Sequence, residues 1–381
     1  MKLIHIADTH LGLAAFSRLD PETGMNLREK QIYDNFLRGI NDIINQKPDA
    51  LVHAGDLFDT VKPKTKAYTT VLEALERLRA ADIPLIIIAG NHSMTKTRYT
   101  TSPYEVLTYH PGKITAAYKF RYEKAEIGDT VFHLLPNMLR PEDYRTEFDK
   151  IELSKSRHNV LVTHGLATQI KDKRLATVAE HELDGTILGE NFDYIALGHY
   201  HRQCQITDNA WYSGSQEFLT YGEIKDEKGG LIVDTAKRTV TPMVLPHTPM
   251  ADCGTIKCAG MHPGDITEEI ISRVSAKHLP LGAMAQITLD QLCREDGKGI
   301  DMKQLAGIRE GLLDLKIRVR AAEEDTVQPL QQDIRMIDYL QEFSSFIDRQ
   351  GQLTAKQKAF IAARGREILV QVMEEHRGEV E

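Results

Sequence analysis

Cysteine is scarce in this chain of 381 residues, and its four cysteines form no CxxC pair. They suggest no disulfide framework, so a reducing cytoplasm is the natural compartment. No run of eighteen apolar residues exists, and we therefore expect no membrane span and no membrane partner. The opening MKLIHIADTH has too short an apolar stretch for a signal peptide, because His5 and Asp8 interrupt it.

An excess of positive charge is also lacking. The formal net charge is −8, with 41% hydrophobic and 27% charged residues. This composition is that of an ordinary globular protein with an ample core, and the length suits two or three domains. It argues against a protein that coats nucleic acid by charge alone. A nuclease is not excluded, since its basic groups can be confined to one groove and its metal ions supply local positive charge.

The first part of the chain repeats one pattern, in which a short apolar run is followed by a polar tip and a helical stretch. The period of an amphipathic helix appears at 29–46 and 66–81. Apolar runs that predict strands lie at 3–7, 50–54 and 83–89. Strands that alternate with helices predict an α/β sandwich.

From about residue 114 the pattern becomes richer in strands. The apolar runs of this part lie at 131–135, 159–163, 194–197, 211–215 and 230–234. Around 246–249 the chain changes character, which we interpret as a domain boundary. The sequence contains no internal repeat and no low-complexity segment.

The remaining chain predicts a small α/β domain followed by two helices. The expected strands and helices of the α/β domain alternate, at 255–258, 266–277, 285–289, 302–313 and 316–320. Two amphipathic helices follow near 330–350 and 354–376. We therefore expect three domains, at 1–249, 250–325 and 326–381.

Polar side chains that can bind metal follow the predicted strands of the first part. They are Asp8, His10, Asp56, Asn91, His92, His164, His199 and His201. In Asp8-x-His10 and His199-x-His201 an extended chain would point both side chains to one side. Strand ends of such a sheet converge on one edge, so these groups can share a site. Glycines accompany them, as expected where the backbone turns sharply beside a ligand.

The mixture of donors indicates the kind of metal. Carboxylates, an amide oxygen and imidazoles suit manganese, iron or zinc better than magnesium or calcium. Seven ligands are too many for one tetrahedral ion, but they fit two ions that share a bridging carboxylate. Ions about 3.5–4 Å apart can clamp the attacking and leaving oxygens of a phosphoryl displacement.

Each of these residues alone has an ordinary structural explanation. A single strand histidine such as His5 or His53 is more often a hydrogen-bonded core residue, and we assign both to structure. An aspartate at a strand end is often only a turn or a helix cap. The joint occurrence in this order, with glycines beside it, favours a metal site.

Five short blocks resemble a known family. DTHLG, GDLFD, GNHS, THG and GHYH match the blocks of the calcineurin-like metallophosphoesterases. The opening IADTHLG, the stretch HAGDLFDT and the order of the C-terminal regions are similar to the SbcD and meiotic-recombination-eleven branch of double-strand-break repair nucleases. The resemblance implies a four-layer sandwich of two mixed sheets flanked by helices, with a small capping domain and a C-terminal helical hairpin.

The resemblance also implies a role for each residue. Asp8, His10 and His201 would hold one ion, Asn91, His164 and His199 the other, and Asp56 would bridge them. The expected cofactor is two Mn²⁺ per chain, with Fe²⁺ or Zn²⁺ as alternatives. His92 would be no ligand but the general acid that protonates the departing sugar oxygen, a task that suits a near-neutral pKa.

Two positions depart from the family or vary within it. Relatives have an acidic residue where this chain has Ser93, and that residue is expected to orient the histidine and raise its pKa. Because the metal ligands are present, we expect Ser93 to alter rate or pH dependence rather than abolish activity. Asp59 replaces the histidine of some relatives, which bears on the balance of exonuclease and endonuclease activity.

The implied function is a manganese-dependent DNA nuclease of a double-strand-break repair complex. It would act as a 3′–5′ exonuclease on duplex ends and an endonuclease on single strands, in the cytoplasm or, in a prokaryote, at the nucleoid. The alternatives are another phosphodiesterase or phosphatase on the same scaffold, acting on nucleotides, and a non-catalytic scaffold with a decayed site. The extra C-terminal regions argue against the first, and the complete ligand set argues against the second.

The sequence also contains candidate residues for contacts with DNA, with a second copy of the chain and with a partner protein. The candidate DNA contacts are Arg18, Lys62, Lys64, Lys66 and Arg98, each of which could equally be a solvated surface residue. A homodimer is expected through helices near 66–81 and 103–110, unless Tyr104, Val106 and Leu107 fill their own core. The coiled-coil base of an SbcC-type ATPase would bind the C-terminal hairpin. The candidate partner-binding residues are Ile337, Leu340, Phe343, Ile368, Leu369 and Val372, unless the two helices only pack on each other.

Overall fold

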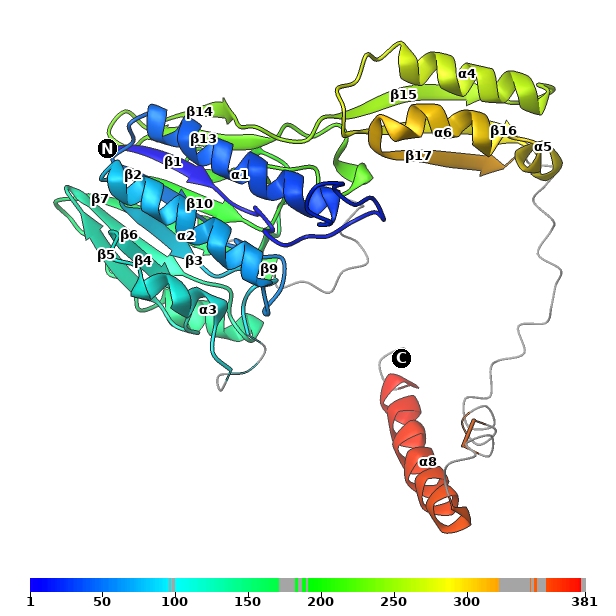
Figure 1. Cartoon of the computed structure of the whole chain (residues 1–381). Coiled ribbons are helices and arrows are strands. Elements are labelled where there is room, and N and C mark those ends of the chain that lie inside the picture. Colours follow the sequence, from blue (N-terminus) through cyan, green and yellow to red (C-terminus); the bar gives the residue numbers. More distant parts are fainter. Residues whose placement is uncertain are drawn as a thin grey trace. The chain divides into compact units, whose positions relative to one another are not determined.

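The computed structural model of the chain describes residues 1–95, 97, 100–170, 182–183, 187–189, 191–321, 343, 346–347 and 354–377. The chain divides into two compact units, Met1–Arg320 and Ala321–Glu381. Figure 1 labels the elements along the chain. Among the described helices, none combines the length and the apolar character that crossing a membrane requires.

The first unit contains two six-stranded sheets. The first sheet has the order β14-β13-β1-β2-β3-β4, in which β1 to β4 run parallel and β13 is antiparallel to both of its neighbours. Its strands are β1 (Lys2–Ile6), β2 (Ala50–His53), β3 (Leu85–Ile88), β4 (Ile114–Ala117), β13 (Gly229–Asp234) and β14 (Thr239–Val244).

The second sheet has the order β11-β12-β10-β7-β6-β5, with a parallel centre and antiparallel edges. Its strands are β5 (Glu123–Ile127), β6 (Thr130–Leu135), β7 (His158–His164), β10 (Tyr194–Gly198), β11 (Cys204–Gln205) and β12 (Ala210–Tyr212). Two short strands, β8 (Leu166–Ala167) and β9 (Glu182–Leu183), pair beside it.

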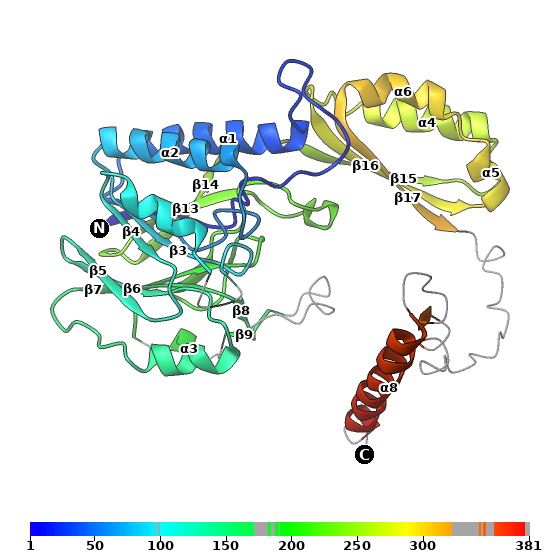
Figure 2. The same cartoon turned by 60° about the horizontal axis from the view of Figure 1, so that its bottom comes forward.

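Helices cover the outer faces of the two sheets, which gives four layers (Figure 2). The helices α1 (Leu27–Asn45) and α2 (Thr65–Ala80) lie on the first sheet, and α3 (Pro141–Phe148) lies on the second. Ile4 belongs to the core under α1 and α2, whereas its neighbour Leu3 belongs to the core between the sheets. Because both faces of β1 are buried, the strand is a continuous apolar run. The four-layer expectation is confirmed.

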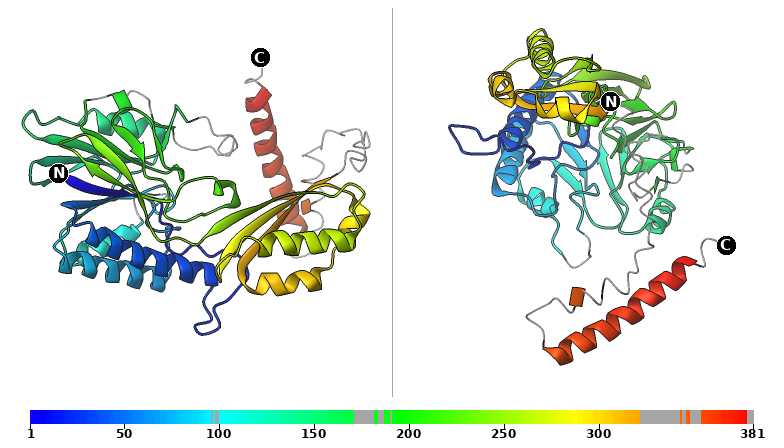
Figure 3. Two further views of the ribbon diagram at one scale, coloured as in Figure 1. Left: turned by 90° about the horizontal axis from the view of Figure 1, so that it is seen from above. Right: turned by 90° about the vertical axis from the view of Figure 1, so that its right-hand side faces the viewer.

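A small α/β region follows the sandwich in the same unit. It consists of β15 (Met250–Lys257), α4 (Pro263–Ser275), β16 (Ala283–Leu292), α5 (Arg294–Lys298), α6 (Met302–Glu310) and β17 (Leu312–Ala321). The sheet order is β15-β16-β17, and α4 and α6 cover one of its faces (Figure 3). This region has its own apolar core, and Met284 and Leu313 pack against Phe218 and Tyr221 of the preceding part.

The second unit is described mainly by one helix, α8 (Ala355–Arg377). A capping box opens it, as the sequence predicts, since Thr354 N–H donates to Gln357 Oε1 at 2.9 Å and Gln357 N–H donates to Thr354 Oγ1 at 3.4 Å. The ring of Phe343 packs on Gly365, where a Cβ would overlap it. Most of the predicted helix at 330–350 lies outside the described residues.

Several predicted elements end elsewhere. The helix expected at 302–313 ends at Glu310, because the chain turns at Gly311 and enters β17. The helix expected at 103–110 is the 3₁₀ helix η1 (Pro103–Tyr109), and its amino end is capped by Ser102. The strand expected at 211–215 is β12, which ends at Tyr212.

Candidate metal centre

The predicted ligands meet at one edge of the two sheets, where β1, β2, β3, β7 and β10 end. Asp8, His10, Asp56 and His164 are each at most 1% exposed. Asn91, His199 and His201 are half-buried at the rim. The convergence expected from parallel strand ends is therefore observed.

The local backbone differs from the prediction. Asp8 and His10 have φ values of 52° and 45°, and Asp56 and His199 have 52° and 101°. The backbone at Asp8, His10 and His199 is therefore not extended, and that part of the prediction is wrong, although Asp8 and His10 do converge as expected. Left-handed turns after the strands aim these side chains instead. Such conformations cost free energy in residues other than glycine and are concentrated at functional sites.

Two glycines give the ligands their space. A Cβ at Gly55, where φ is 103°, would overlap the ring of His164. A Cβ at Gly90 would overlap the carboxylate of Asp56. These positions therefore accept only glycine while the ligands keep their places.

The ligands form two overlapping groups. Asp8, His10 and His201 each offer a donor atom within 4.8 Å of the others, and so do Asp8, Asp56 and His164. His164 Nε2 lies 2.8 Å from the Asn91 side-chain oxygen, and His199 Nδ1 lies 3.0 Å from the same oxygen. The two groups share Asp8, so the donor set has two ends, as two ions require.

The hydrogen bonds of His164 indicate that its Nε2 atom is placed to bind either a metal ion or a second proton. Its Nδ1 lies 2.8 Å from the carbonyl of Ala54, which can only accept, so Nδ1 carries the proton. Its Nε2 then faces the Asn91 oxygen and, at 3.3 Å, Asp56 Oδ2. These partners are acceptors too, so the nitrogen lone pair needs either a second proton or a metal ion beside it.

His10 and His201 are held in the same way. His10 Nδ1 donates to Asp59 Oδ1 at 3.0 Å, and His201 Nδ1 donates to Glu223 Oε1 at 3.0 Å. The buried Nε2 of His10 has no hydrogen-bond partner among the described residues. A carboxylate or carbonyl behind a histidine ligand is the usual arrangement at metal sites. The residues present therefore fit a metal centre.

The electrostatics of the site favour positive charge. Burial alone would lower the pKa of His164, but the charge and hydrogen bond of Asp56 outweigh it and raise the pKa to about 9. Burial opposes a raised pKa in His10 as well, where the hydrogen bond with Asp59 and the charges of Asp56 and Asp8 prevail. Burial would raise the pKa of Asp56, but His164 lowers it well below the usual range. Ionised carboxylates thus draw protons or cations into the site.

His92 lies at the exposed rim beside this group. Its backbone N–H donates to Asp56 Oδ1 at 2.9 Å, and its Nδ1 lies 3.3 Å from the carbonyl of Asp59. Its ring meets His10 edge to face, with 4.7 Å between ring centroids. The pKa of His92 is lowered, chiefly because surrounding protein disfavours the charged ring. His92 also forms a third group of possible metal donors with His10 and Asp59, whose donor atoms lie within 4.8 Å of one another.

Ser93 does not support His92 as the family resemblance suggests. Its fully buried hydroxyl lies 3.0 Å from the Tyr104 hydroxyl and 3.4 Å from Asp56 Oδ1. The ring of His92 is hydrogen-bonded to Asp59 instead. Ser93 thus contacts the central carboxylate, so the expected influence on His92 is indirect.

The two histidines assigned to structure have structural contacts. His5 Nδ1 lies 2.8 Å from the Tyr194 hydroxyl, and His53 Nε2 lies 3.0 Å from Thr9 Oγ1. Burial, the largest influence in both, lowers the pKa of His5 to about 3 and that of His53 to about 4. Both rings are therefore neutral core groups at neutral pH.

The candidate DNA contacts have different surroundings. Arg18 donates to the backbone carbonyls of Arg309, Glu310 and Leu312 where α6 ends and β17 begins, so its guanidinium is already engaged. Lys64 pairs with Glu29 at 2.6 Å, while Lys62 and Lys66 are exposed. Arg98 lies outside the described residues.

The candidate residues for contacts with other proteins also differ in their exposure. Tyr104 and Leu107 are fully buried in their own core, whereas Val106 is 38% and Tyr109 80% exposed. Phe343 is half-buried in the second unit. Ile337 and Leu340 lie outside the described residues, and so do the side chains of Ile368, Leu369 and Val372.

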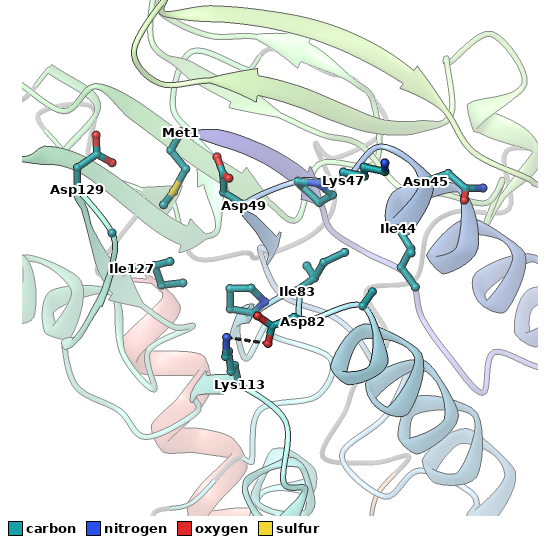
Figure 4. Close-up of a pocket in the computed structure, with 14 residues that line it drawn as sticks. Met1, Ile44, Asn45, Lys47, Asp49, Asp82, Ile83, Lys113, Ile127 and Asp129 are labelled. Atoms are coloured by element: carbon teal, nitrogen blue, oxygen red, sulfur yellow. Dashed lines mark ion pairs between the residues drawn. The ribbon is translucent and has the colours of Figure 1, made fainter.

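A separate cavity of about 1000 Å³ opens at the opposite ends of the strands (Figure 4). Ile44, Ile83 and Ile127 form part of its apolar lining, and Lys113 pairs with Asp82 at 2.7 Å within it. Its lining, all in the described part of the chain, includes none of the seven predicted ligands. The candidate metal centre therefore lies at the other ends of the strands and not in this cavity.

Sequence reasoning missed one buried carboxylate of the site. Glu223 lies in the 3₁₀ turn η3 (Tyr221–Glu223), behind His201. Burial would raise its pKa, but the hydrogen bond with His201 and the charge of Lys228 lower it to about 2. No local pattern in GEIKDEKGG distinguishes this residue from its acidic neighbours, so the sequence carries no signal for it.

Comparison with known proteins agrees with this geometry. Residues 1–203 match the model of the calcineurin-like phosphoesterases. The chain belongs to this family. The matched region contains all seven predicted ligands as well as His92.

Individual relatives narrow the comparison. The DNA double-strand break repair protein Mre11 of Methanococcus maripaludis is 28% identical over 241 residues, 60% of this chain and 60% of that protein. Mre11 of Methanopyrus kandleri is 31% identical over 248 residues, 60% of this chain and 51% of that protein. The SbcD component of the nuclease SbcCD of Staphylococcus saprophyticus is 27% identical over 305 residues, 73% of this chain and 76% of that protein. The chain thus spans at most 60% of the two archaeal relatives.

Proposed function

We propose that this calcineurin-like phosphoesterase is a manganese-dependent DNA nuclease of a double-strand-break repair complex. The observation that carries the proposal is the set of seven donors from separate segments, in which His10 Nε2 has no hydrogen-bond partner among the described residues and His164 Nε2 faces acceptors only. The names of the relatives, which are repair proteins and a component of a nuclease, support DNA as the substrate. Cleavage of duplex ends from 3′ to 5′ and of single strands is part of the proposal.

The residues divide the work of holding two ions. Asp8, His10 and His201 would hold one, Asn91, His164 and His199 would hold the other, and the carboxylate of Asp56 would serve both. Bound ions would neutralise the charge that develops on a phosphodiester during hydrolysis. Asp59, Glu223 and the carbonyl of Ala54 keep the rings of His10, His201 and His164 in the tautomer that offers Nε2.

His92 acts as the general acid. The carbonyl of Asp59 accepts its Nδ1–H, so Nε2 is the atom that carries the transferable proton to the departing sugar oxygen. Its ring is exposed, whereas the seven predicted ligands are buried or half-buried, and this exposure supports contact with the substrate.

A single assay tests the proposal. The purified chain with Mn²⁺ or with EDTA is given labelled duplex DNA, single-stranded DNA and a chromogenic phosphodiester. We expect cleavage of both DNAs with Mn²⁺ and none with EDTA. Hydrolysis of the chromogenic ester alone would favour another phosphodiesterase, and no hydrolysis at all would favour a scaffold.

The matched control for this assay is Asp56→Asn. The variant keeps the size of the side chain but removes the charge on which both ions depend, so we expect loss of cleavage with an unchanged circular dichroism spectrum. Cleavage at the wild-type rate would contradict the two-ion arrangement.

The proposal extends to domains and partners. We propose that 1–249 is the nuclease domain, 250–325 a capping domain that contacts DNA, and 326–381 a hairpin that binds an SbcC-type ATPase. The exposed rings of Phe346 and Phe360, at 55% and 74%, support a partner at the last region. The exposed Val106 and Tyr109 of η1 support a homodimer, which light scattering at micromolar concentration would test.

A further inference from the structure

The carboxylate of Glu223 reaches the candidate metal centre from the side of the small α/β region. One of its oxygens, Oε1, accepts the Nδ1–H of His201 at 3.0 Å, and its side chain is 7% exposed. His201 is itself half-buried, and its donor atom lies within 4.8 Å of those of Asp8 and His10. Glu223 therefore decides which nitrogen of His201 faces the other two ligands.

A buried lysine fixes this carboxylate. Lys228 Nζ donates to Glu223 Oε2 at 2.6 Å, and the Lys228 side chain is fully buried. The same ammonium donates to the carbonyl of His201 at 3.1 Å and to Ser215 Oγ at 2.8 Å. Lys228 thus holds the backbone of His201 and, through Glu223, its ring.

The turn that carries Glu223 is anchored at its other end. The Tyr221 hydroxyl donates to Asp314 Oδ2 at 2.7 Å, and Lys316 Nζ lies 5.0 Å from the centre of the Tyr221 ring. Asp314 and Lys316 belong to β17 of the small α/β region. A residue on a turn held from both sides is well suited to fix a ligand within a fraction of an ångström.

We propose that Glu223 is a positioning residue for His201, and through it for the ion that Asp8, His10 and His201 hold. The proposal rests on the two-ion site of the proposed function. His164, in the other half of the site, depends on the main-chain carbonyl of Ala54, which no substitution of Glu223 changes. Loss of Glu223 should therefore weaken one ion and spare the other.

The test is a calorimetric titration of the full chain with Mn²⁺, in the variant Glu223→Gln. The amide keeps the shape of the side chain but must turn its NH₂ group toward either His201 Nδ1–H or Lys228. We expect two ions in the wild type, and in the variant an affinity about 10–100-fold lower for one ion with the other unchanged. The matched control is Glu227→Gln, an exposed carboxylate on the same segment, which should bind both ions like the wild type.

A second variant covers the case in which the unpaired ammonium of Lys228 unfolds the chain. In Glu223→Met with Lys228→Met both the acceptor for His201 and the buried ammonium are absent, and the same selective loss of one ion is expected. Two ions of wild-type affinity, or an equal weakening of both, would overturn the positioning role while leaving the two-ion site in place. A wild-type chain that binds no Mn²⁺ would overturn the proposed function together with this inference.

Discussion

The buried hydroxyl of Ser93 lies 3.4 Å from Oδ1 of Asp56, the carboxylate at the centre of the candidate metal site. The Ser93 hydroxyl also lies 3.0 Å from the Tyr104 hydroxyl. The Tyr104 hydroxyl in turn accepts a hydrogen bond from the backbone N–H of Leu57. The residue after the Asn-His pair is therefore part of the support of Asp56. A substitution of Ser93 should therefore first change metal binding and the stability of the protein.

We predict that Ser93→Asp destabilises the metal-free protein. The new carboxyl would be fully buried beside Asp56, where two like charges cannot both be compensated. The free energy of unfolding in EDTA should fall by about 3 kcal/mol, the cost of an uncompensated buried charge. Saturating Mn²⁺ should narrow the difference, because a bound cation compensates both carboxylates. Chemical denaturation with and without Mn²⁺ measures both effects.

The control for this variant is Ser93→Ala, which removes the hydroxyl without adding charge. It should cost about 1 kcal/mol in either condition, as the loss of a buried hydrogen bond does. If Ser93→Asp is as stable as the wild type in EDTA, the contact between residue 93 and Asp56 does not contribute to the free energy of unfolding.

His92→Ala should separate chemistry from metal binding. His92 shares a group of possible donors with His10 and Asp59, but that group contains neither Asp8 nor Asp56. We expect the variant to bind two Mn²⁺ per chain and to lose about 10²–10⁴-fold in turnover, the usual contribution of a general acid. Metal analysis that finds fewer ions in the variant than in the wild type would make His92 a ligand.

The metal-free protein should lose stability between about pH 6.5 and pH 9. Burial disfavours the charged ring of His164, but Asp56 outweighs it and raises the pKa in the folded chain from 6.5 to about 9. Protonation of His164 therefore contributes its full stabilisation below pH 6.5, and this contribution is lost as the pH rises through 9. Thermal unfolding in EDTA across this range measures the loss. In Mn²⁺ the melting temperature should vary less over the same range, because the ion replaces the proton beside His164.

The layered fold and the donor set could be predicted because both leave a mark on neighbouring residues. Strands such as β1 are buried on both faces and so are continuous apolar runs, and the residues after them carry metal-binding side chains. Gly55 and Gly90 show in the sequence because no other residue leaves room for His164 and Asp56. Local patterns of this kind are sufficient to indicate where a metal centre lies.

The supports of the ligands could not be predicted, because they come from distant parts of the chain. His10 depends on Asp59, and His201 on Glu223, and each is an acidic residue among others in its segment. The left-handed backbone of Asp8 is likewise set by tertiary contacts, since its N–H donates to the carbonyl of Gly55 and its carboxylate accepts the N–H of His199. Arg18 was expected at DNA because a basic residue in a loop does not reveal that the end of α6 lies against it.

Removal of the chain after about residue 325 should separate nuclease activity from partner binding. The proposed metal centre and all the apolar cores of the first unit lie before Arg320, so they do not need the second unit for their own packing. We therefore expect the truncated protein to keep its folded melting transition and most of its Mn²⁺-dependent cleavage of DNA. It should fail to co-purify with a coiled-coil ATPase of the SbcC type, and ATP should no longer stimulate it.

A point variant refines this last prediction within the full chain. The ring of Phe360 on α8 is 74% exposed, so it is available to contact another protein. Phe360→Ser should weaken binding of the ATPase by at least tenfold, as loss of a buried aromatic anchor does, without changing cleavage by the nuclease alone. Lys356→Ser, an exposed position in the first turn of α8, serves as the control and should bind normally. Undiminished binding by the truncated protein would mean that the hairpin only packs on itself and that the ATPase binds another surface.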